Sequence, residues 1–123
     1  MNLAKLCKAM FISIPRLNPS DCADRIRSGA AILVDVREPD EWTEGVADQA
    51  ALLPLSDLNG PRTHWKPVLE TVANRELVLY CRAGGRSLIA AKVLAAEGFR
   101  TANGGAFSAW VEAGWPTVLP PQG

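Results

Sequence analysis

Short apolar runs alternate along the whole chain with polar segments that begin or end at glycine and proline. The run Ile32-Leu33-Val34-Asp35-Val36 is apolar apart from one acid, as expected of a strand that is covered on both faces. Leu77 to Tyr80 forms a second such run, and the segment from Leu88 to Glu97 has the composition of a helix that Gly98 ends. Shorter strands are predicted over 11–14, 51–53 and 99–102, a turn over 103–105, and shorter helices over 19–28, 39–45, 55–59, 61–74 (interrupted at Pro67) and 106–113.

The order of these elements predicts the fold class. Strands that alternate with helices indicate a parallel sheet whose right-handed crossovers place helices on both faces. The chain is therefore expected to be an α/β protein, with three layers (α/β/α) around a central parallel sheet of about five strands. Ligands of such sheets bind beyond the carboxyl ends of the strands. Asp35 and Arg37 end one predicted strand and Cys81 ends another, so we expect all three at one rim.

Length and charge limit the classes of protein to consider. The 123 residues suffice for one domain, which we expect over 11–118, between an N-terminal extension (1–10) and a C-terminal tail (119–123). Thirteen basic residues balance thirteen acidic ones, so no overall field exists to recruit nucleic acid or a membrane surface. No apolar run has transmembrane length and no signal peptide is recognisable, so a cytoplasmic location is expected.

The cysteines are few and widely spaced. Cys7, Cys22 and Cys81 form no CxxC pair, which argues against a disulfide framework and against a structural zinc site. We therefore expect reduced thiols, no metal and no cofactor. Cys7 and Cys22 lack basic neighbours; Cys22 is expected to pack in the core, with a resolving thiol as the alternative.

One loop concentrates the chemistry of the chain. The heptapeptide Cys81-Arg82-Ala83-Gly84-Gly85-Arg86-Ser87 joins a predicted strand to the start of the longest predicted helix, where N–H groups and the helix dipole favour negative charge. Gly84 and Gly85 allow backbone N–H groups to point inward as an anion-binding nest. Arg82 and Arg86 add positive charge that favours a thiolate. The thiol is thus a candidate nucleophile, with a buried, inert cysteine as the alternative.

Arg86 lies at the helix start, where a cation is opposed by the helix dipole. We therefore expect Glu41 or Asp35 to compensate it from the same rim. Arg82 is either an anion-binding residue or a solvated surface arginine. Ser87 is expected in the first helical turn, where its hydroxyl helps to cap the helix.

The loop resembles the active-site loop of the rhodanese-like sulfurtransferases, Cys-x-x-Gly-x-Arg-Ser, at Cys81, Gly84, Arg86 and Ser87. Further blocks resemble the upstream and C-terminal signatures of the family, and together they extend the resemblance from Ile12 to Val118. These blocks are Asp35-Val36-Arg37-Glu38, Glu41-Trp42, Gly45, Asn103-Gly104-Gly105, Ala109-Trp110 and Ala113-Gly114-Trp115-Pro116. The resemblance implies a rhodanese-like fold.

The resemblance also implies an activity. Cys81 would take the outer sulfur of a donor such as thiosulfate as a persulfide and pass it to cyanide or a thiol. Partners would be small-molecule sulfur donors and acceptors, with a protein acceptor as a further partner. The anion or persulfide would be held by Arg82, Ala83, Gly84, Gly85, Arg86 and Ser87, with Asp35, Arg37 and Glu41 in support.

The chain departs from the family pattern at Val46 and Gln49, where histidine and glycine are usual. The single histidine, His64, is expected to be structural or solvated. Tryptophans 42, 110 and 115 are expected to anchor the core.

Two other activities stay open. The first is a sulfur carrier or protein-interaction module that docks through its apolar segment, Leu3 to Phe11. The second is a phosphatase or arsenate reductase. Related cell-cycle phosphatases have one more loop residue, and the four residues between Cys81 and Arg86 fit sulfur better than phosphate.

Overall fold

The computed structural model of the chain describes residues 3–4 and 11–121. Its central sheet has four parallel strands in the order β3-β1-β4-β5. A second, two-stranded sheet pairs β2 antiparallel with β6. The strands are β1 (Ala31–Asp35), β2 (Val46–Ala47), β3 (Ala51–Leu52), β4 (Glu76–Cys81), β5 (Thr101–Ala106) and β6 (Thr117–Val118). The predicted α/β class and parallel sheet are confirmed.

The expected fifth strand, over 11–14, is wrong. The chain instead meets the edge of β5 slightly later, through a single bridge between Arg16 and Asn103. Two backbone hydrogen bonds hold it there, from Leu17 N–H to Asn103 O (3.0 Å) and from Asn103 N–H to Pro15 O (2.9 Å). Pro15 has no N–H and Pro19 begins the next helix, so a longer ladder cannot form on either side.

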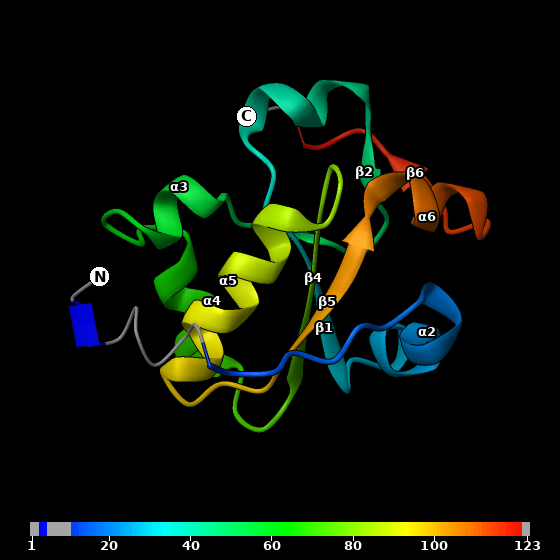
Figure 1. Cartoon of the computed structure of the whole chain (residues 1–123). Coiled ribbons are helices and arrows are strands. Elements are labelled where there is room, and N and C mark those ends of the chain that lie inside the picture. The colour runs from blue at the N-terminus through cyan, green and yellow to red at the C-terminus, as the bar shows by residue number, and fades with distance from the viewer. Residues whose placement is uncertain (1–2, 5–10, 122–123) are drawn as a thin grey trace.

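The helices cover both faces of the sheet, as predicted. They are α2 (Pro19–Ser28), the 3₁₀ helix η1 (Pro39–Glu44), α3 (Leu55–Leu58), α4 (Trp65–Thr71), α5 (Gly85–Ala96) and α6 (Phe107–Glu112). Figure 1 shows α3, α4 and α5 on one side of the sheet and α2 and α6 on the other. The arrangement is the expected three-layer α/β/α sandwich.

Two hydrophobic cores result, one on each face of the sheet. Val34, Leu77 and Leu79 face the core beneath α3, α4 and α5, whereas Leu33 and Val78 face the one beneath α2 and α6. All five side chains are fully buried. This double coverage explains why β1 and β4 read as nearly continuous apolar runs rather than alternating ones.

The tryptophans divide between the two cores. Trp110 and Trp115 are buried in the core beneath α2 and α6, with their rings edge to face at 5.1 Å. Trp65 is fully buried in the other core and donates its Nε1–H to Pro54 O at 2.8 Å. Trp42 is only partly buried, so the expected core anchor at that position is wrong.

The helix predicted over 61–74 is shorter than expected. It begins at Trp65, and Pro67 lies in its first turn, where a missing N–H costs no intrahelical hydrogen bond. Asp57 accepts the N–H groups of Thr63 and His64, both at 2.9 Å, and this pins the approach to the helix. His64 is exposed.

The turn predicted over 103–105 is a continuation of strand β5. It pairs with β4 through an irregular register between Leu79 and Tyr80. A side chain at Gly104 would bring a Cβ within 3.2 Å of Leu79 O and 3.4 Å of the Trp110 ring. The glycine therefore serves close packing of strand and ring rather than chain reversal.

Most of the expected N-terminal extension, including Cys7, lies outside the described residues, as do 122–123 of the expected tail. Within the described part, no helix combines the length and apolarity needed to span a bilayer. The cytoplasmic location stays a prediction.

Candidate active site

Cys81 lies at the carboxyl end of β4, where the turn into α5 begins, as the order of the elements predicts. Its sulfur accepts a hydrogen bond from Gly84 N–H at 3.0 Å, and Ser87 approaches it with both its N–H and its hydroxyl at 3.4 Å. Gly84 has φ +99°, a conformation that glycine adopts without strain. Of the two glycines predicted to form the nest, Gly84 donates its N–H to the thiol itself.

Burial and hydrogen bonds shift the pKa of Cys81 in opposite directions. Burial is the largest single influence on its pKa and raises it, because a thiolate loses its hydration. The hydroxyl and N–H of Ser87, with the N–H groups of Ala83 and Gly84, act in the opposite direction and hold the pKa below its ordinary value. A favoured thiolate was predicted from the N–H groups of the helix start and the loop together with the two arginines. Backbone N–H groups and one hydroxyl are its main source.

Ser87 lies in the first turn of α5, as predicted, but α5 has no side-chain cap hydrogen bond, so the predicted capping role is wrong. Its hydroxyl also lies 2.8 Å from Asn103 Oδ1 and 3.1 Å from Gly84 O, so its one proton is within reach of three acceptors. Since a thiolate is the only charged acceptor of the three, ionisation of Cys81 draws that proton toward the sulfur.

Asn103 is a site residue that sequence reasoning missed. The side chain is only 5% exposed and links β5 to the cysteine loop. Its Nδ2 donates to Gly84 O at 3.1 Å, and its Oδ1 accepts Gly105 N–H at 2.9 Å. The available signal was a polar residue directly after the predicted strand over 99–102, which follows the cysteine strand in the chain. The misassigned turn over 103–105 concealed it.

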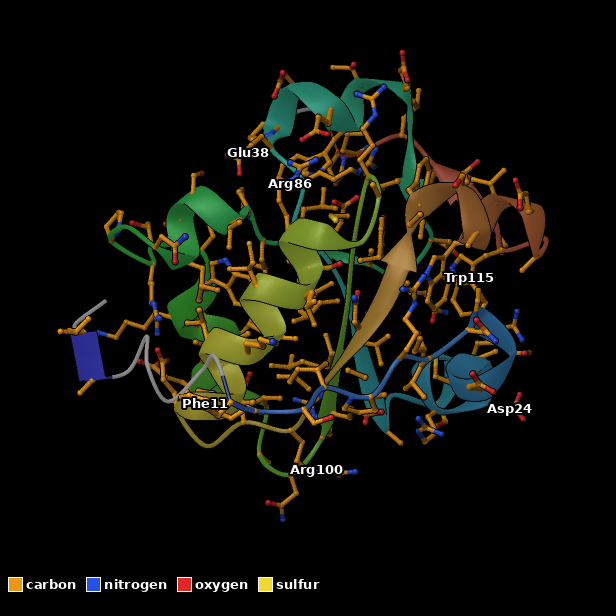
Figure 2. The ribbon with its side chains drawn as sticks, in the orientation of Figure 1. Phe11, Asp24, Glu38, Arg86, Arg100 and Trp115 are labelled. Atoms are coloured by element: carbon orange, nitrogen blue, oxygen red, sulfur yellow. The ribbon has the colours of Figure 1, made fainter. Side chains whose placement is uncertain are left out.

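Glu41 is the acid that compensates Arg86. Two hydrogen bonds of 2.6 and 2.9 Å join its carboxylate to the guanidinium, so the pair links η1 to the start of α5. These bonds from Arg86 are the main cause that lowers the pKa of Glu41 to about 2. Figure 2 shows Arg86 at the same end of the molecule as Glu38, whose backbone N–H also donates to Glu41.

Asp35, the other candidate partner of Arg86, is fully buried and pairs with Arg37 at 2.8 Å. It also accepts the hydroxyl of Tyr80 at 2.6 Å, and that oxygen in turn accepts Ala47 N–H at 3.0 Å. Burial, followed by the charge of Asp35, raises the pKa of Tyr80 well above its usual range. Arg37 further donates to Gly45 O at 2.9 Å. These residues hold β1, β4 and β2 together, and their hydrogen bonds do not reach Cys81.

Arg82 is exposed and lines a cavity of about 670 Å³ between η1 and α6. The cavity adjoins the cysteine loop, because Arg82 follows Cys81 and Glu41 holds Arg86. Cys81 itself is 1% exposed and is not a lining residue. The wall consists of Arg37, Asp40, Glu41, Thr43, Glu44, Arg82, Phe107, Ser108, Val111 and Glu112.

The remaining candidates lie apart from this site. Cys22 is buried in the core beneath α2 and α6, whereas Cys81 belongs to the core on the other face of the sheet. Burial raises the pKa of the Cys22 thiol to about 11, so it packs as predicted and is poorly suited to a resolving role. In residues 3–4 and 11–121, no three His, Cys, Asp or Glu side chains are grouped to hold a metal ion.

Comparisons with known proteins agree with this geometry. The family model described as the Rhodanese-like domain matches residues 18–113. The chain is 36% identical over 93 residues to a protein of Allochromatium vinosum named sulfurtransferase, and the match covers 72% of this chain and 79% of that protein.

Two solved structures share the fold. A rhodanese-related protein from Thermoplasma volcanium is 29% identical, has a TM-score of 0.70, and is matched over 86% of this chain and 99% of its own. A Rhodopseudomonas palustris protein described as of unknown function, "Possible Tyrosine Phosphatase", is 29% identical with a TM-score of 0.72, over 94% and 92% of the two chains. With most of its length matched by the family model and by these proteins, the chain belongs to the rhodanese-like domain family.

Proposed function

We propose that the protein is a sulfurtransferase that moves a sulfane sulfur from a donor such as thiosulfate to cyanide or a thiol through a persulfide on Cys81. The observation that carries the proposal is the set of hydrogen bonds to the Cys81 sulfur from Gly84 and Ser87, in a loop that begins at a strand end. These donors stabilise a negatively charged sulfur, whether the thiolate or the terminal sulfur of a persulfide.

The proposed reaction has two displacements. The Cys81 thiolate attacks the outer sulfur of thiosulfate, the S–S bond of the donor breaks, and sulfite leaves with the electron pair. The resulting Cys81 persulfide then gives its outer sulfur to the nucleophilic acceptor, and the thiolate is restored. Neither step needs an external oxidant or reductant, and the kinetics are ping-pong.

The two loop arginines have different parts in this proposal. Arg86 is held by Glu41 in a bidentate pair, so it stiffens the start of α5 and keeps a guanidinium close to the loop. Arg82 is exposed and has no ion-pair partner among the described residues, so it is free to meet an incoming anion.

The test is thiocyanate formation from thiosulfate and cyanide by the reduced protein. We expect turnover that Cys81→Ala abolishes and that Arg86→Ala lowers about tenfold or more, because Glu41 then lies uncompensated beside the developing negative charge. Circular dichroism establishes that each variant is folded.

Turnover that survives in Cys81→Ala would overturn the proposal. A stable persulfide on Cys81 without turnover would point to a sulfur carrier instead, and hydrolysis of an aryl phosphate to a phosphatase. The loop length argues against the phosphatase, with four residues between Cys81 and Arg86.

A further inference from the structure

The cavity beside the cysteine loop has acidic and apolar walls. Asp40 and Glu44 contribute carboxylates from η1, and Glu112 contributes one from α6. Phe107 and Val111 supply apolar surface between them. A volume of about 670 Å³ lies within the range of small-ligand sites and also accommodates a short peptide segment.

The charged side chains of the cavity wall do not balance one another. Arg37 is neutralised by Asp35 at 2.8 Å, and Glu41 by Arg86 at 2.6 Å. The three carboxylates of Asp40, Glu44 and Glu112 are left facing a single guanidinium, that of Arg82. None of these four groups has an ion pair within the described part of the chain. Since the whole chain has zero formal charge, the negative excess is a property of this cavity.

We propose that the acceptor of the Cys81 sulfur is a thiol that carries positive charge. A cavity lined by charge of one sign raises the local concentration of an oppositely charged substrate. The apolar surface of Phe107 and Val111 receives the methylene groups that separate the cation from the thiol. The inference rests on the proposed function, because it concerns the second of its two displacements.

The same field has the opposite effect on the first displacement. Thiosulfate is a dianion, so Asp40, Glu44 and Glu112 oppose its approach while only Arg82 favours it. Neutralising the carboxylates should therefore slow delivery to a cationic thiol and accelerate loading from thiosulfate. A reciprocal change of this kind is not produced by a general loss of structure.

The experiment separates the two displacements. The Cys81 persulfide is formed with thiosulfate, excess donor is removed, and a thiol is added while mass spectrometry follows the loss of the extra sulfur. Three small thiols of similar size differ in charge: cysteamine is cationic, 2-mercaptoethanol neutral and 3-mercaptopropionate anionic. Two further acceptors are peptides with one cysteine, which is flanked by lysines in one peptide and by glutamates in the other. They test whether a cationic peptide or a small aminothiol is the better acceptor.

The test variant is Asp40→Asn/Glu112→Gln, which removes one carboxylate from each side of the cavity. Its matched control is Asp24→Asn/Glu70→Gln, which removes the same two residue types at exposed positions that do not line this cavity. Figure 2 shows Asp24 on α2, well away from Arg86. Comparing the same thiols across proteins cancels their different intrinsic reactivities.

In the wild type and the control we expect cysteamine to be favoured over 3-mercaptopropionate. The ratio of the two rate constants should fall about tenfold in the test variant, and it should also fall in 1 M salt, where charges are screened within roughly 3 Å. A ratio that is equal in the test variant and the control overturns the inference and leaves the sulfurtransferase intact. A protein that takes no sulfur onto Cys81 overturns the proposed function, and the inference with it.

Discussion

At the scale of single residues, opposing effects act on one sulfur atom. Burial disfavours the Cys81 thiolate, and hydrogen bonds from Ser87, Ala83 and Gly84 favour it more strongly, so that its pKa lies below the ordinary value. Gly84 donates its N–H to the sulfur at 3.0 Å and has a φ of +99°, a conformation that favours glycine. Asn103 keeps the loop in this conformation by accepting from Gly105 and donating to Gly84. The lowered pKa of Cys81 thus comes chiefly from groups that carry no charge.

Replacing Ser87 by alanine tests this account. The variant loses the hydroxyl donor to the sulfur, so the pKa of Cys81 should rise and the thiolate fraction at pH 7 should fall. We expect alkylation of Cys81 by iodoacetamide at pH 7 to slow about three- to tenfold, and the difference to shrink as pH rises. Peptide-resolved mass spectrometry distinguishes Cys81 from the other cysteines. Ser20→Ala, at an exposed position of α2, is the control, and equal rates in all three proteins would contradict the prediction.

At the scale of elements, the site depends on how short segments are joined around the rim. The pair of Glu41 and Arg86 attaches η1 to α5, and Asp35 attaches β1 to β4 through the hydroxyl of Tyr80. The antiparallel pairing of β2 with β6 fixes the segment that follows η1. The wall of the cavity is therefore assembled from elements that are far apart in the sequence.

The link between η1 and α5 should give the protein a pH-dependent stability. The pKa of Glu41 falls from an ordinary value of 4.5 to about 2 in the folded protein, chiefly through its hydrogen bonds with Arg86. A lowered folded-state pKa adds stability above pH 4.5, and this contribution is lost as pH falls toward 2. Because the pair is partly solvated, we expect Glu41→Gln to lower the free energy of unfolding at pH 7 by about 1 kcal/mol.

Urea unfolding of the wild type and Glu41→Gln between pH 7 and pH 2 measures this effect. The difference between the two proteins should disappear at the acid end. Glu70→Gln, at an exposed position of α4, should follow the wild type at every pH. A Glu41→Gln difference that persists unchanged at the lowest pH would show that the carboxylate charge is not its source.

At the scale of the whole molecule, the sheet separates two cores, and the cysteine loop lies at its carboxyl edge. α3, α4 and α5 stabilise one face while α2 and α6 stabilise the other (Figure 1). The final strand, β6, ends at Val118 and closes the small sheet against β2. This closure supports our proposal that residues 11–118 are one folding unit.

A chain of residues 11–118 should therefore unfold cooperatively at the same temperature as the full chain, to within about 2–4 °C. Shortening it further to residue 115 removes β6, leaves β2 unpaired, and should lower the melting temperature. Calorimetry of the three chains measures both effects. A shift of more than about 10 °C in the 11–118 chain would place part of the folding unit in residues 1–10 or 119–123.

The amino-acid sequence alone determined the features that depend on residues close together in the chain. β1 and β4 were recognisable because both of their faces are covered, and α2 was recognisable because proline, an acid and Gly29 mark its ends. The cysteine loop was recognisable because a nest needs glycines and N–H groups at successive positions. The parallel sheet and the three layers followed from element order, whereas the number of strands did not, because the segment 11–14 forms no strand.

Only the tertiary structure decided which distant groups meet. Glu41, and not Asp35, pairs with Arg86, which is 45 residues later in the chain. Asp35 instead accepts the hydroxyl of Tyr80, also 45 residues later. Asn103 gained its role because β5 lies beside β4, a fact that no local pattern contains. The acidic cavity likewise exists because η1 and α6 face each other. The packing of the crossover helices on the sheet brings such partners together, and its free energy is spread over both cores. The spacing of residues along the chain therefore cannot predict which of them meet.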